Sequence, residues 1–307
     1  MTEIQDYKMG EFETLYHYTS ADGLKSIIEN KTLRFSDYRF LNDIDEIQYG
    51  KNIFLNVISK LKKKYDDKIS VLEYWEETVK KIENVKVPYF KNLSISKDNV
   101  VNMTQCFNDN LRFYLLSLTT LSDNKDMWNM YSGNNPGYRL KINSHKLLDY
   151  FHSIRDSYIK LDIVFLPDFH SAIHYGEESE KIVHSVLEDC LSRNEMDIVQ
   201  GGSIFNILAF IKDEAFRSEK EYRFGFYFLD EMEKVNNQEY AKKVFLNKNG
   251  VFYPYMEFQQ FPFGDIVEEI MISPYNKSEL TEIGLKELLR ENKLEHIKIE
   301  KSRIKIR

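Results

Sequence analysis

The stretch that most constrains this chain lies between residues 203 and 229, where an apolar run passes into an aromatic one. Apolar residues from Ser203 to Phe216 predict a buried helix, because they cover every side of its early turns. The near-continuous aromatic run Tyr222–Leu229 predicts a strand that is buried on both faces. The charged junction Arg217–Arg223 therefore lies where a helix is expected to become a strand.

The junction holds two glutamates and two arginines beside this apolar sequence. On a strand, Glu219, Glu221 and Arg223 project to one face, and the aromatic residues project to the other. Charged groups in such surroundings are costly unless they are paired or used. Two interpretations follow: a structural Glu–Arg ion pair, or a catalytic carboxylate that a neighbouring arginine holds in place.

Length and composition predict one domain that spans residues 1–307. The chain is 42% hydrophobic, enough for a sizeable core, and its six prolines and twelve glycines argue against long linkers. The formal charge of -7 disfavours a protein that coats nucleic acid. The two distant cysteines predict neither a disulfide framework nor a cysteine-based zinc site. The polar N-terminus lacks a signal region and no apolar run is long enough to span a membrane, so we expect a cytoplasmic protein without a membrane partner.

Strands and helices of uneven length alternate along the chain. This pattern predicts an α+β fold with a single mixed or antiparallel sheet, flanking helices and a helical insertion at residues 47–110. The first helix of the insertion follows Asn42 or Asp43 as its N-cap, with Glu46 at capping-box distance. The segment 87–110 is consistent with either helix or loop. Strands are expected at residues 14–19, 32–36, 111–120, 138–142, 158–166, 222–229, 251–258, 269–272 and 297–306.

Several common chemistries lack their sequence signatures here. The chain has no phosphate-binding Gly-x-x-x-x-Gly-Lys loop, no Gly-rich dinucleotide fingerprint and no Gly-x-Ser-x-Gly elbow. His170 and His174 are four residues apart, but Pro167 disfavours the helix that a zinc pair would need, so no metal is predicted. Carboxylates are plentiful, yet no compact carboxylate–Lys motif marks a magnesium-dependent nuclease.

Blocks in the order typical of one bacterial family run through nearly the whole chain. They are Leu15–Ser20, Gly23-Leu, Ile27-Ile28, Thr32–Ser36, Leu41–Glu46, Met127–Tyr131 with Gly137, Glu219–Arg223 and Glu269–Pro274. Together they resemble the uncharacterised family called domain of unknown function 2971. Members of that family are often uncharacterised or defence-associated proteins, which assigns no activity directly.

The opening of the chain is also similar, more distantly, to ADP-ribosyltransferase domains. These begin with a strand carrying His-Tyr-Thr, then Gly-Leu, a short helix and a second strand. They use a histidine on the first strand, an aromatic residue in the middle and a glutamate on a later strand. The matching positions here are His17, Tyr131 and Glu221, and the resemblance implies an ADP-ribosyltransferase-like core.

That resemblance implies NAD as the substrate and assigns roles to these residues. Glu221 would stabilise the positive charge that develops on the ribose as nicotinamide leaves. His17 would hydrogen-bond a ribose hydroxyl, and Tyr131 would stack on the nicotinamide. Further ligand-binding candidates are Thr19, Arg34, Asn42, Trp128, Arg139 and Arg223. Among them, the arginines are candidates for the pyrophosphate or for holding Glu221, and Trp128 would support the stacking ring.

The predicted activity is therefore ADP-ribose transfer to a protein or nucleic-acid acceptor, or NAD hydrolysis, in a phage-defence or toxin system. A non-enzymatic module that senses a nucleotide in the same cleft is a second hypothesis, and a metal-dependent nuclease effector is a third. The basic strand Ile297–Ile306 favours nucleic-acid contact, although basic residues on an edge strand also guard against aggregation. The sequence does not determine the oligomeric state.

Overall fold

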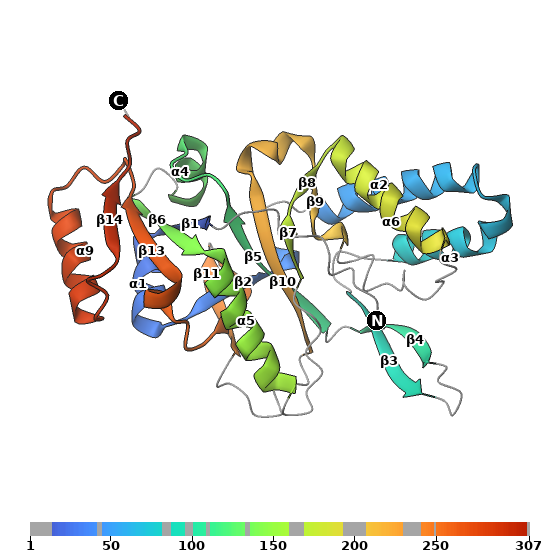
Figure 1. Cartoon of the computed structure of the whole chain (residues 1–307), viewed down its shortest axis with the longest axis horizontal. Coiled ribbons are helices and arrows are strands. Elements are labelled where there is room, and N and C mark those ends of the chain that lie inside the picture. Colours follow the sequence, from blue (N-terminus) through green and yellow to red (C-terminus); the bar gives the residue numbers. More distant parts are fainter. Residues whose placement is uncertain are drawn as a thin grey trace.

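A ten-stranded sheet forms the centre of the computed structural model, and helices lie against it (Figure 1). The structure describes residues 14–41, 45–81, 87–95, 101–108, 111–132, 136–159, 169–192, 207–229, 241–248 and 250–305. The strands are β1 (Thr14–Ser20), β2 (Leu33–Asp37), β3 (Val87–Ile95), β4 (Val101–Asn108), β5 (Leu111–Thr119), β6 (Gly137–Asn143), β7 (Phe169–Ala172), β8 (His174–Tyr175), β9 (Ile211–Lys212), β10 (Glu221–Leu229), β11 (Ala241–Lys248), β12 (Val251–Phe258), β13 (Val267–Ile272) and β14 (Lys298–Lys301). The helices are α1 (Ala21–Asn30), α2 (Glu46–Lys62), α3 (Ile69–Lys81), α4 (Lys125–Ser132), α5 (Ser144–Ile159), α6 (Glu177–Ser192), α8 (Phe263–Ile266) and α9 (Leu280–Glu291), with short 3-10 turns η2 (Tyr38–Phe40), η3 (Asp66–Lys68) and η4 (Glu214–Glu219).

The sheet is mixed and largely antiparallel. Its strand order is β11-β12-β2-β5-β1-β6-β13-β14, and β10 joins it by pairing with β5 and with β7. In this sheet β13 and β14 run parallel, whereas the other described pairs are antiparallel. The predicted α+β class with a mixed sheet and flanking helices is therefore confirmed.

Strand β10 occupies a central position, as its aromatic sequence predicts. It pairs with β5 along its full length and with β7 over four residues, so both of its edges are hydrogen-bonded there. Its side chains from Glu221 to Phe226 are all buried. The aromatic side chains Tyr222, Phe224 and Phe226 pack into the larger core cluster. The prediction of a strand buried on both faces is confirmed for these residues.

Strand β5 separates two large apolar clusters. Tyr114, Leu116 and Leu118 face the first, together with residues of α1, α5 and β13. Phe113 and Leu115 face the second, which is built from α2, α3, α6 and residues 208–211. Because side chains alternate along a strand, one apolar run can supply both cores.

The expected buried helix at 203–216 is wrong beyond residue 208: of the residues that the structure describes there, 207 and 208 are helical and the rest are not α-helical. From residue 211 the chain forms the short strand β9 and then the 3-10 turn η4, whose N-cap Asp213 accepts a hydrogen bond from the backbone N–H of Ala215. Strand β9 pairs in parallel with β8. Buried apolar runs of this length do not distinguish a helix from a short strand and turn, so the tertiary pairing decides.

The segment 47–110, expected as a helical insertion, is helical only in part. The two predicted helices are present as α2 and α3, which pack side by side, whereas the segment left open as helix or loop forms the hairpin β3–β4 (Figure 1). Helix α2 begins at Glu46 with Asp45 as its N-cap, whereas the predicted cap residues Asn42 and Asp43 lie outside the described residues. Glu46 is buried and its carboxylate pairs with Arg223.

The C-terminal strand is shorter than predicted, and the two lysines within it are paired. Strand β14 covers four residues rather than 297–306. Lys298 forms ion pairs with Glu300 and Glu269, and Lys301 pairs with Glu282. The expected strand at 158–166 falls largely on residues outside the described ranges, and residue 159 is the last residue of α5. Within the described residues, no helix is long and apolar enough to cross a membrane.

Candidate functional site

A small pocket opens where β1 diverges from β5. In these two described strands the backbone pairing is confined to Tyr16 and Thr119. The pocket is lined by Tyr16, His17, Tyr18, Ser117, Leu118, Thr119, Met127, Tyr131, Glu219 and Glu221. Its cavity volume is about 10 Å³, which is close to the space that one water molecule needs.

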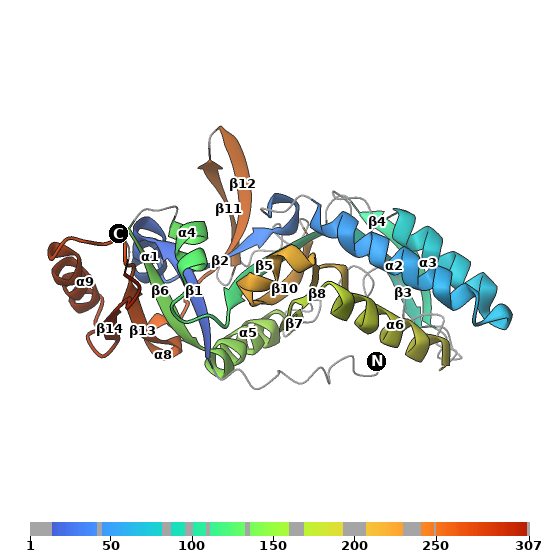
Figure 2. The same ribbon diagram turned by 90° about the horizontal axis from the view of Figure 1, so that it is seen from above.

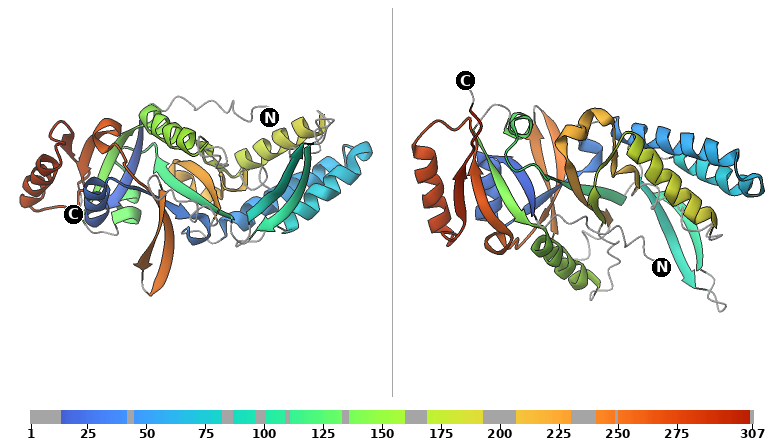
Figure 3. Two further views of the ribbon diagram at one scale, coloured as in Figure 1. Left: turned by 90° about the horizontal axis from the view of Figure 1, so that it is seen from below. Right: turned by 45° about the horizontal axis from the view of Figure 1, so that its top comes forward.

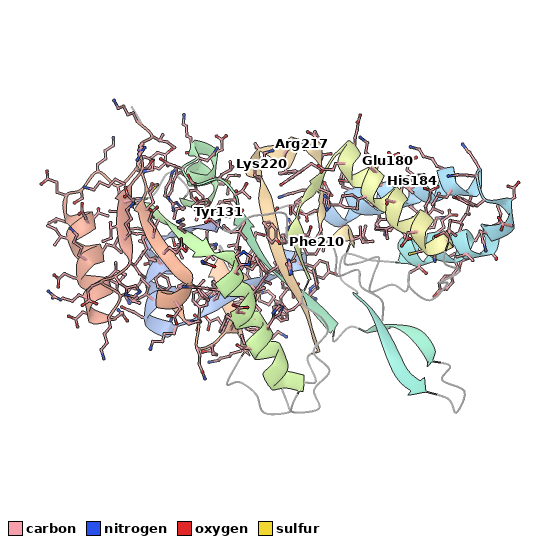
Figure 4. The ribbon with its side chains drawn as sticks, viewed as in Figure 1. Tyr131, Glu180, His184, Phe210, Arg217 and Lys220 are labelled. Atoms are coloured by element: carbon pink, nitrogen blue, oxygen red, sulfur yellow. The ribbon has the colours of Figure 1, made fainter. Side chains whose placement is uncertain are left out.

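The three predicted catalytic residues line this pocket together. His17 comes from β1, Tyr131 from α4 and Glu221 from the start of β10. Figure 4 labels Tyr131 on the α4 side and Lys220 in the turn that leads into β10. The sequence separates the first and last of these residues by about two hundred positions, and the pairing of both β1 and β10 with β5 brings them together.

Glu221 is held rigidly by two cations. Its Oε1 accepts a hydrogen bond from Arg223 Nε at 2.7 Å, and its Oε2 accepts one from Arg223 Nη2 at 3.0 Å. Lys212 Nζ donates to the same Oε2 at 3.2 Å. This bidentate arrangement matches the fork of a guanidinium. The carboxylate is only 5% exposed, so its orientation is fixed.

Arg223 links the pocket to helix α2. Its Nη1 and Nη2 donate to the carboxylate of Glu46 on α2, and Nη1 also donates to the backbone carbonyl of Ala209 at 2.8 Å. Lys212 donates to Glu219 at 2.7 Å. Three carboxylates and two cations thus form one buried group, which we call the charge network. Its formal charge is -1 when every member is ionised.

The two carboxylates bound to Arg223 differ in their pKa. Burial raises the pKa of Glu221, but the charges of Arg223 and Lys212 and hydrogen bonds from Arg223 and Ser117 outweigh it and bring the pKa to about 2. Burial also raises the pKa of Glu46, and here the charge of Arg223 does not overcome it. The difference arises because Glu221 has a second cation, Lys212, in contact. Glu221 is therefore ionised at neutral pH.

His17 is neutral at physiological pH. Burial lowers its pKa to about 4, against the opposing effect of a hydrogen bond with the backbone of Ser117. The imidazole therefore offers the pocket neutral hydrogen-bonding groups and no charge.

Tyr131 supplies an aromatic surface at the mouth of the pocket. Its side chain is 37% exposed, and its neighbour Met130 is 49% exposed. Burial raises the pKa of Tyr131, and the charges of Glu221 and Glu219 raise it further. The hydroxyl consequently stays protonated, and the ring is free to contact a ligand.

Trp128 and Arg139 lie beside the pocket but do not line it. Trp128 is buried, packs edge-on against Tyr18 with ring centroids 4.7 Å apart, and donates its indole N–H to Asp123 at 2.8 Å. Arg139 is 1% exposed and stacks over the ring of Tyr16. These contacts place both residues in the small third core cluster or against it.

The other predicted ligand-binding residues lie elsewhere. Arg34 pairs with Glu257 at 2.6 Å and also donates to Ser26, away from the pocket lining. Thr19 packs against the first turn of α1, where a Cβ on Gly23 would come within 2.1 Å of its hydroxyl. Asn42 lies outside the described residues. Arg223 is the exception, since it holds Glu221.

The sequence interpretation missed several residues that shape the site. Glu46 was assigned to a helix cap, and Lys212 and Ser117 were not singled out. Lys212 did carry a signal, because it is a lone cation inside the apolar run before residue 217. Within the described ranges, no group of three or more histidine, cysteine, aspartate or glutamate side chains could hold a metal ion.

Residues 127–224 match the model of a protein family described as Protein of unknown function (DUF2971). The match covers about a third of the chain and includes Tyr131, Glu221 and Arg223, whereas His17 precedes it. It supports the resemblance to this family that the sequence blocks predict. No curated protein and no solved structure matches the chain, so the more distant resemblance to ADP-ribosyltransferases has no support from known proteins.

Proposed function

We propose that the pocket binds NAD through its nicotinamide ribose, within an ADP-ribosyltransferase-like core, and that the protein transfers ADP-ribose to an acceptor or hydrolyses NAD. The observation that carries this proposal is the meeting of His17, Tyr131 and Glu221 around one small pocket. Three side chains from separate elements converge there, each in the protonation state that the reaction requires.

The reaction breaks the bond between nicotinamide and the ribose. The bonding electron pair leaves with the nicotinamide nitrogen and neutralises that ring, while positive charge develops on the ribose. Water or an acceptor hydroxyl then attacks the ribose carbon and loses its proton to solvent. A fixed negative charge beside the ribose lowers the energy of this transition state.

Glu221 suits this electrostatic role. With a pKa of about 2 it is ionised at neutral pH, and its bonds to Arg223 and Lys212 fix its position before the substrate arrives. A carboxylate with so low a pKa is a poor proton acceptor.

His17 and Tyr131 suit the binding of the neutral and aromatic parts of the substrate. The neutral imidazole of His17 can hydrogen-bond a ribose hydroxyl without repelling the cationic nicotinamide ring. The exposed ring of Tyr131 can stack on that ring, which is attracted to the π face. The pocket is far smaller than NAD, so the ADP portion would lie outside it. There Lys220, exposed between Glu219 and Glu221, replaces Arg34 and Arg139 as the proposed phosphate contact.

The test is nicotinamide release from NAD by the purified full chain, with cell extract as a source of acceptor. We expect release by the wild type and its loss in Glu221→Gln, with thermal melting as the folding control. Tyr131→Ala is the second variant, because an exposed side chain can be removed with little loss of stability. We expect it to raise the KM for NAD about tenfold.

Met130→Ala is the matched control, because Met130 is the next residue on α4 and is more exposed than Tyr131. It should leave nicotinamide release unchanged. Absence of release under all conditions, together with no change in melting temperature on addition of NAD, would refute the proposal. Equal activity of Tyr131→Ala and the wild type would remove the role given to the tyrosine ring.

One observation favours a second function, a module that binds a nucleotide without turnover. Both oxygens of Glu221 already accept hydrogen bonds from Arg223, as they would in a purely structural ion pair. This alternative expects NAD or another nucleotide to raise the melting temperature while no nicotinamide is released. Loss of that shift in Tyr131→Ala, but not in Met130→Ala, would place the ligand in the pocket.

A further inference from the structure

Helix α4 brings two side chains to the pocket, Met127 and Tyr131, which lie one turn apart on the same face of the helix. The helix packs against β1 and β6, toward the end of the sheet that β13 and β14 form (Figure 2). In both views of Figure 3 the C-terminal elements β14 and α9 lie at that same end of the molecule. Any contact that fixes α4 therefore also fixes one wall of the pocket.

The apolar contacts of α4 are few. The helix has eight residues, and its buried side chains Met127 and Trp128 share the small third core cluster with Tyr18. Among the described residues, neither of the two large clusters includes a side chain of α4. Hydrogen bonds should therefore contribute more to the position of α4 than they do for a helix that packs into a large core.

Asp123, which lies just before α4, accepts three hydrogen bonds through its two carboxylate oxygens. Its Oδ1 accepts from the indole N–H of Trp128 at 2.8 Å and from the hydroxyl of Ser302 at 2.8 Å. Its Oδ2 accepts from the backbone N–H of Arg303 at 2.9 Å. One carboxylate thus joins α4 to a segment that lies 180 residues away in the sequence.

The segment 302–304 is itself fixed to the sheet and to the third core cluster. The backbone N–H of Ser302 donates to the carbonyl of Ile272 on β13 at 3.0 Å, directly after β14 ends. The hydroxyl of Ser302 also accepts from the backbone N–H of Ile304 at 3.1 Å. The side chain of Ile304 packs against the cluster that contains Trp128. Asp123 therefore ties α4 to an anchored segment.

We infer that Asp123 is a positioning residue for the pocket, because its bonds to Trp128 and to segment 302–304 hold α4, and with it the ring of Tyr131, in place. Asp123 does not line the pocket, so it acts through Tyr131. This inference rests on the function proposed for the pocket, in which that ring stacks on the nicotinamide. Loss of these bonds should weaken the binding of NAD and leave the bond-breaking step, which Glu221 assists, unchanged.

Two variants weaken this link in different ways. Asp123→Asn keeps one oxygen that can accept from Trp128 and Ser302, but its amide N–H groups face the backbone N–H of Arg303, so two donors oppose each other. Ser302→Ala removes one donor and leaves the carboxylate intact. Asp126→Asn is the matched control, because it neutralises an exposed carboxylate on the first turn of the same helix.

The first measurement is deuterium exchange of the backbone amides of α4 in the full chain, followed by mass spectrometry. We expect Asp123→Asn and Ser302→Ala each to speed this exchange about tenfold, because each loses one hydrogen bond that involves a charged group. The amides of β10 should keep the wild-type rate, which shows that the fold is intact, and Asp126→Asn should leave α4 at the wild-type rate. A wild-type rate for α4 in Asp123→Asn would overturn the inference.

The second measurement is the KM and kcat for nicotinamide release from NAD. Asp123→Asn should raise the KM several-fold and leave kcat unchanged. Added to Tyr131→Ala, it should raise the KM no further, because the position of α4 matters only while the ring is present. Effects of the two substitutions on the KM that multiply would overturn the inference.

The two proposals fail in different ways. If the wild type releases no nicotinamide, the proposed function fails and deuterium exchange alone decides the role of Asp123. Faster exchange of α4 in both Asp123→Asn and Ser302→Ala, with the wild-type rate in Asp126→Asn, would then still support a positioning role for Asp123. Equal exchange in all three variants would overturn it.

Discussion

Neutralising either glutamate that binds Arg223 makes the same chemical change, yet the two substitutions should differ in their effect on stability. The pKa of Glu221 falls from 4.5 to about 2 on folding. A difference of one unit corresponds to about 1.4 kcal/mol, so ionised Glu221 contributes about 3 kcal/mol to the free energy of unfolding. Glu221→Gln should remove most of that at neutral pH.

Glu46→Gln should cost less than about 1 kcal/mol. Burial raises the pKa of Glu46, so its ionised form is disfavoured in the folded protein. The substitution removes a carboxylate whose charge burial disfavours and keeps an oxygen that can accept from Arg223. Arg223 also keeps its bidentate bond to Glu221, so no buried cation is left unpaired.

The pH dependence gives an independent check. Because the pKa of Glu221 is lower in the folded state, its stabilisation is present above pH 4.5 and declines as the pH falls towards 2. The difference between wild type and Glu221→Gln should therefore narrow to roughly 40% of its neutral value by about pH 3. The raised pKa of Glu46 has the opposite sign, so its ionisation lowers stability as the pH rises.

The assay is urea unfolding followed by circular dichroism at neutral and acidic pH, with both variants and the wild type measured in parallel. The reasoning fails if the two variants lose equal stability at neutral pH. It also fails if the deficit of Glu221→Gln grows as the pH falls, because that would mean the carboxylate is not held ionised by its neighbours.

Three further predictions follow from burial and backbone geometry. Arg139→Met should lower the free energy of unfolding less than Arg223→Met does. Nε and Nη1 of Arg139 are buried without hydrogen-bond partners, and its partner Glu269 keeps Lys298, whereas Arg223→Met strands two buried carboxylates and should cost about 4 kcal/mol; equal melting temperatures would contradict this. Gly225→Ala should lower the free energy of unfolding in urea by more than about 2 kcal/mol, because a Cβ there would lie 2.5 Å from the ring of Phe113. A variant as stable as the wild type would show that the ring can move. Because the pKa of His17 is about 4, the rate of nicotinamide release should not change between pH 6 and 8 through protonation of His17. A change in the wild-type rate over this range that is absent in His17→Asn would contradict the neutral role of the imidazole.

The sequence predicts the elements whose pattern is local. The aromatic run identifies β10, and the spacing of Ile53, Phe54, Val57 and Leu61 identifies α2, because both patterns repeat with the period of the element. The helix expected at 203–216 is wrong beyond residue 208 for the opposite reason. A run that is apolar on all sides has no period, and its pairing with β8 is a tertiary contact that no local pattern encodes.

The site shows the same division. Glu221 and Arg223 stand out in the sequence because charged residues interrupt an aromatic run. The sequence allowed either an ion pair or a catalytic carboxylate, and the structure shows that Glu221 and Arg223 form the ion pair. The contribution of Glu46 was not predictable, because its position at the start of a helix has a local explanation as a cap. Only the folded structure shows that the Glu46 carboxylate accepts a hydrogen bond from Arg223, 177 residues away in the sequence.

The position of β5 between two apolar clusters has a consequence for how the protein opens. Releasing α2, α3 and α6 would expose Phe113 and Leu115 to water while the other face of the same strand stays packed. The cost of exposing these side chains to water couples the unfolding of the two apolar clusters. The backbone amides of β5 and β10 should therefore exchange with deuterium only when the whole protein unfolds. The edge hairpin β11–β12, which shares neither cluster beyond its base, should exchange first and on its own.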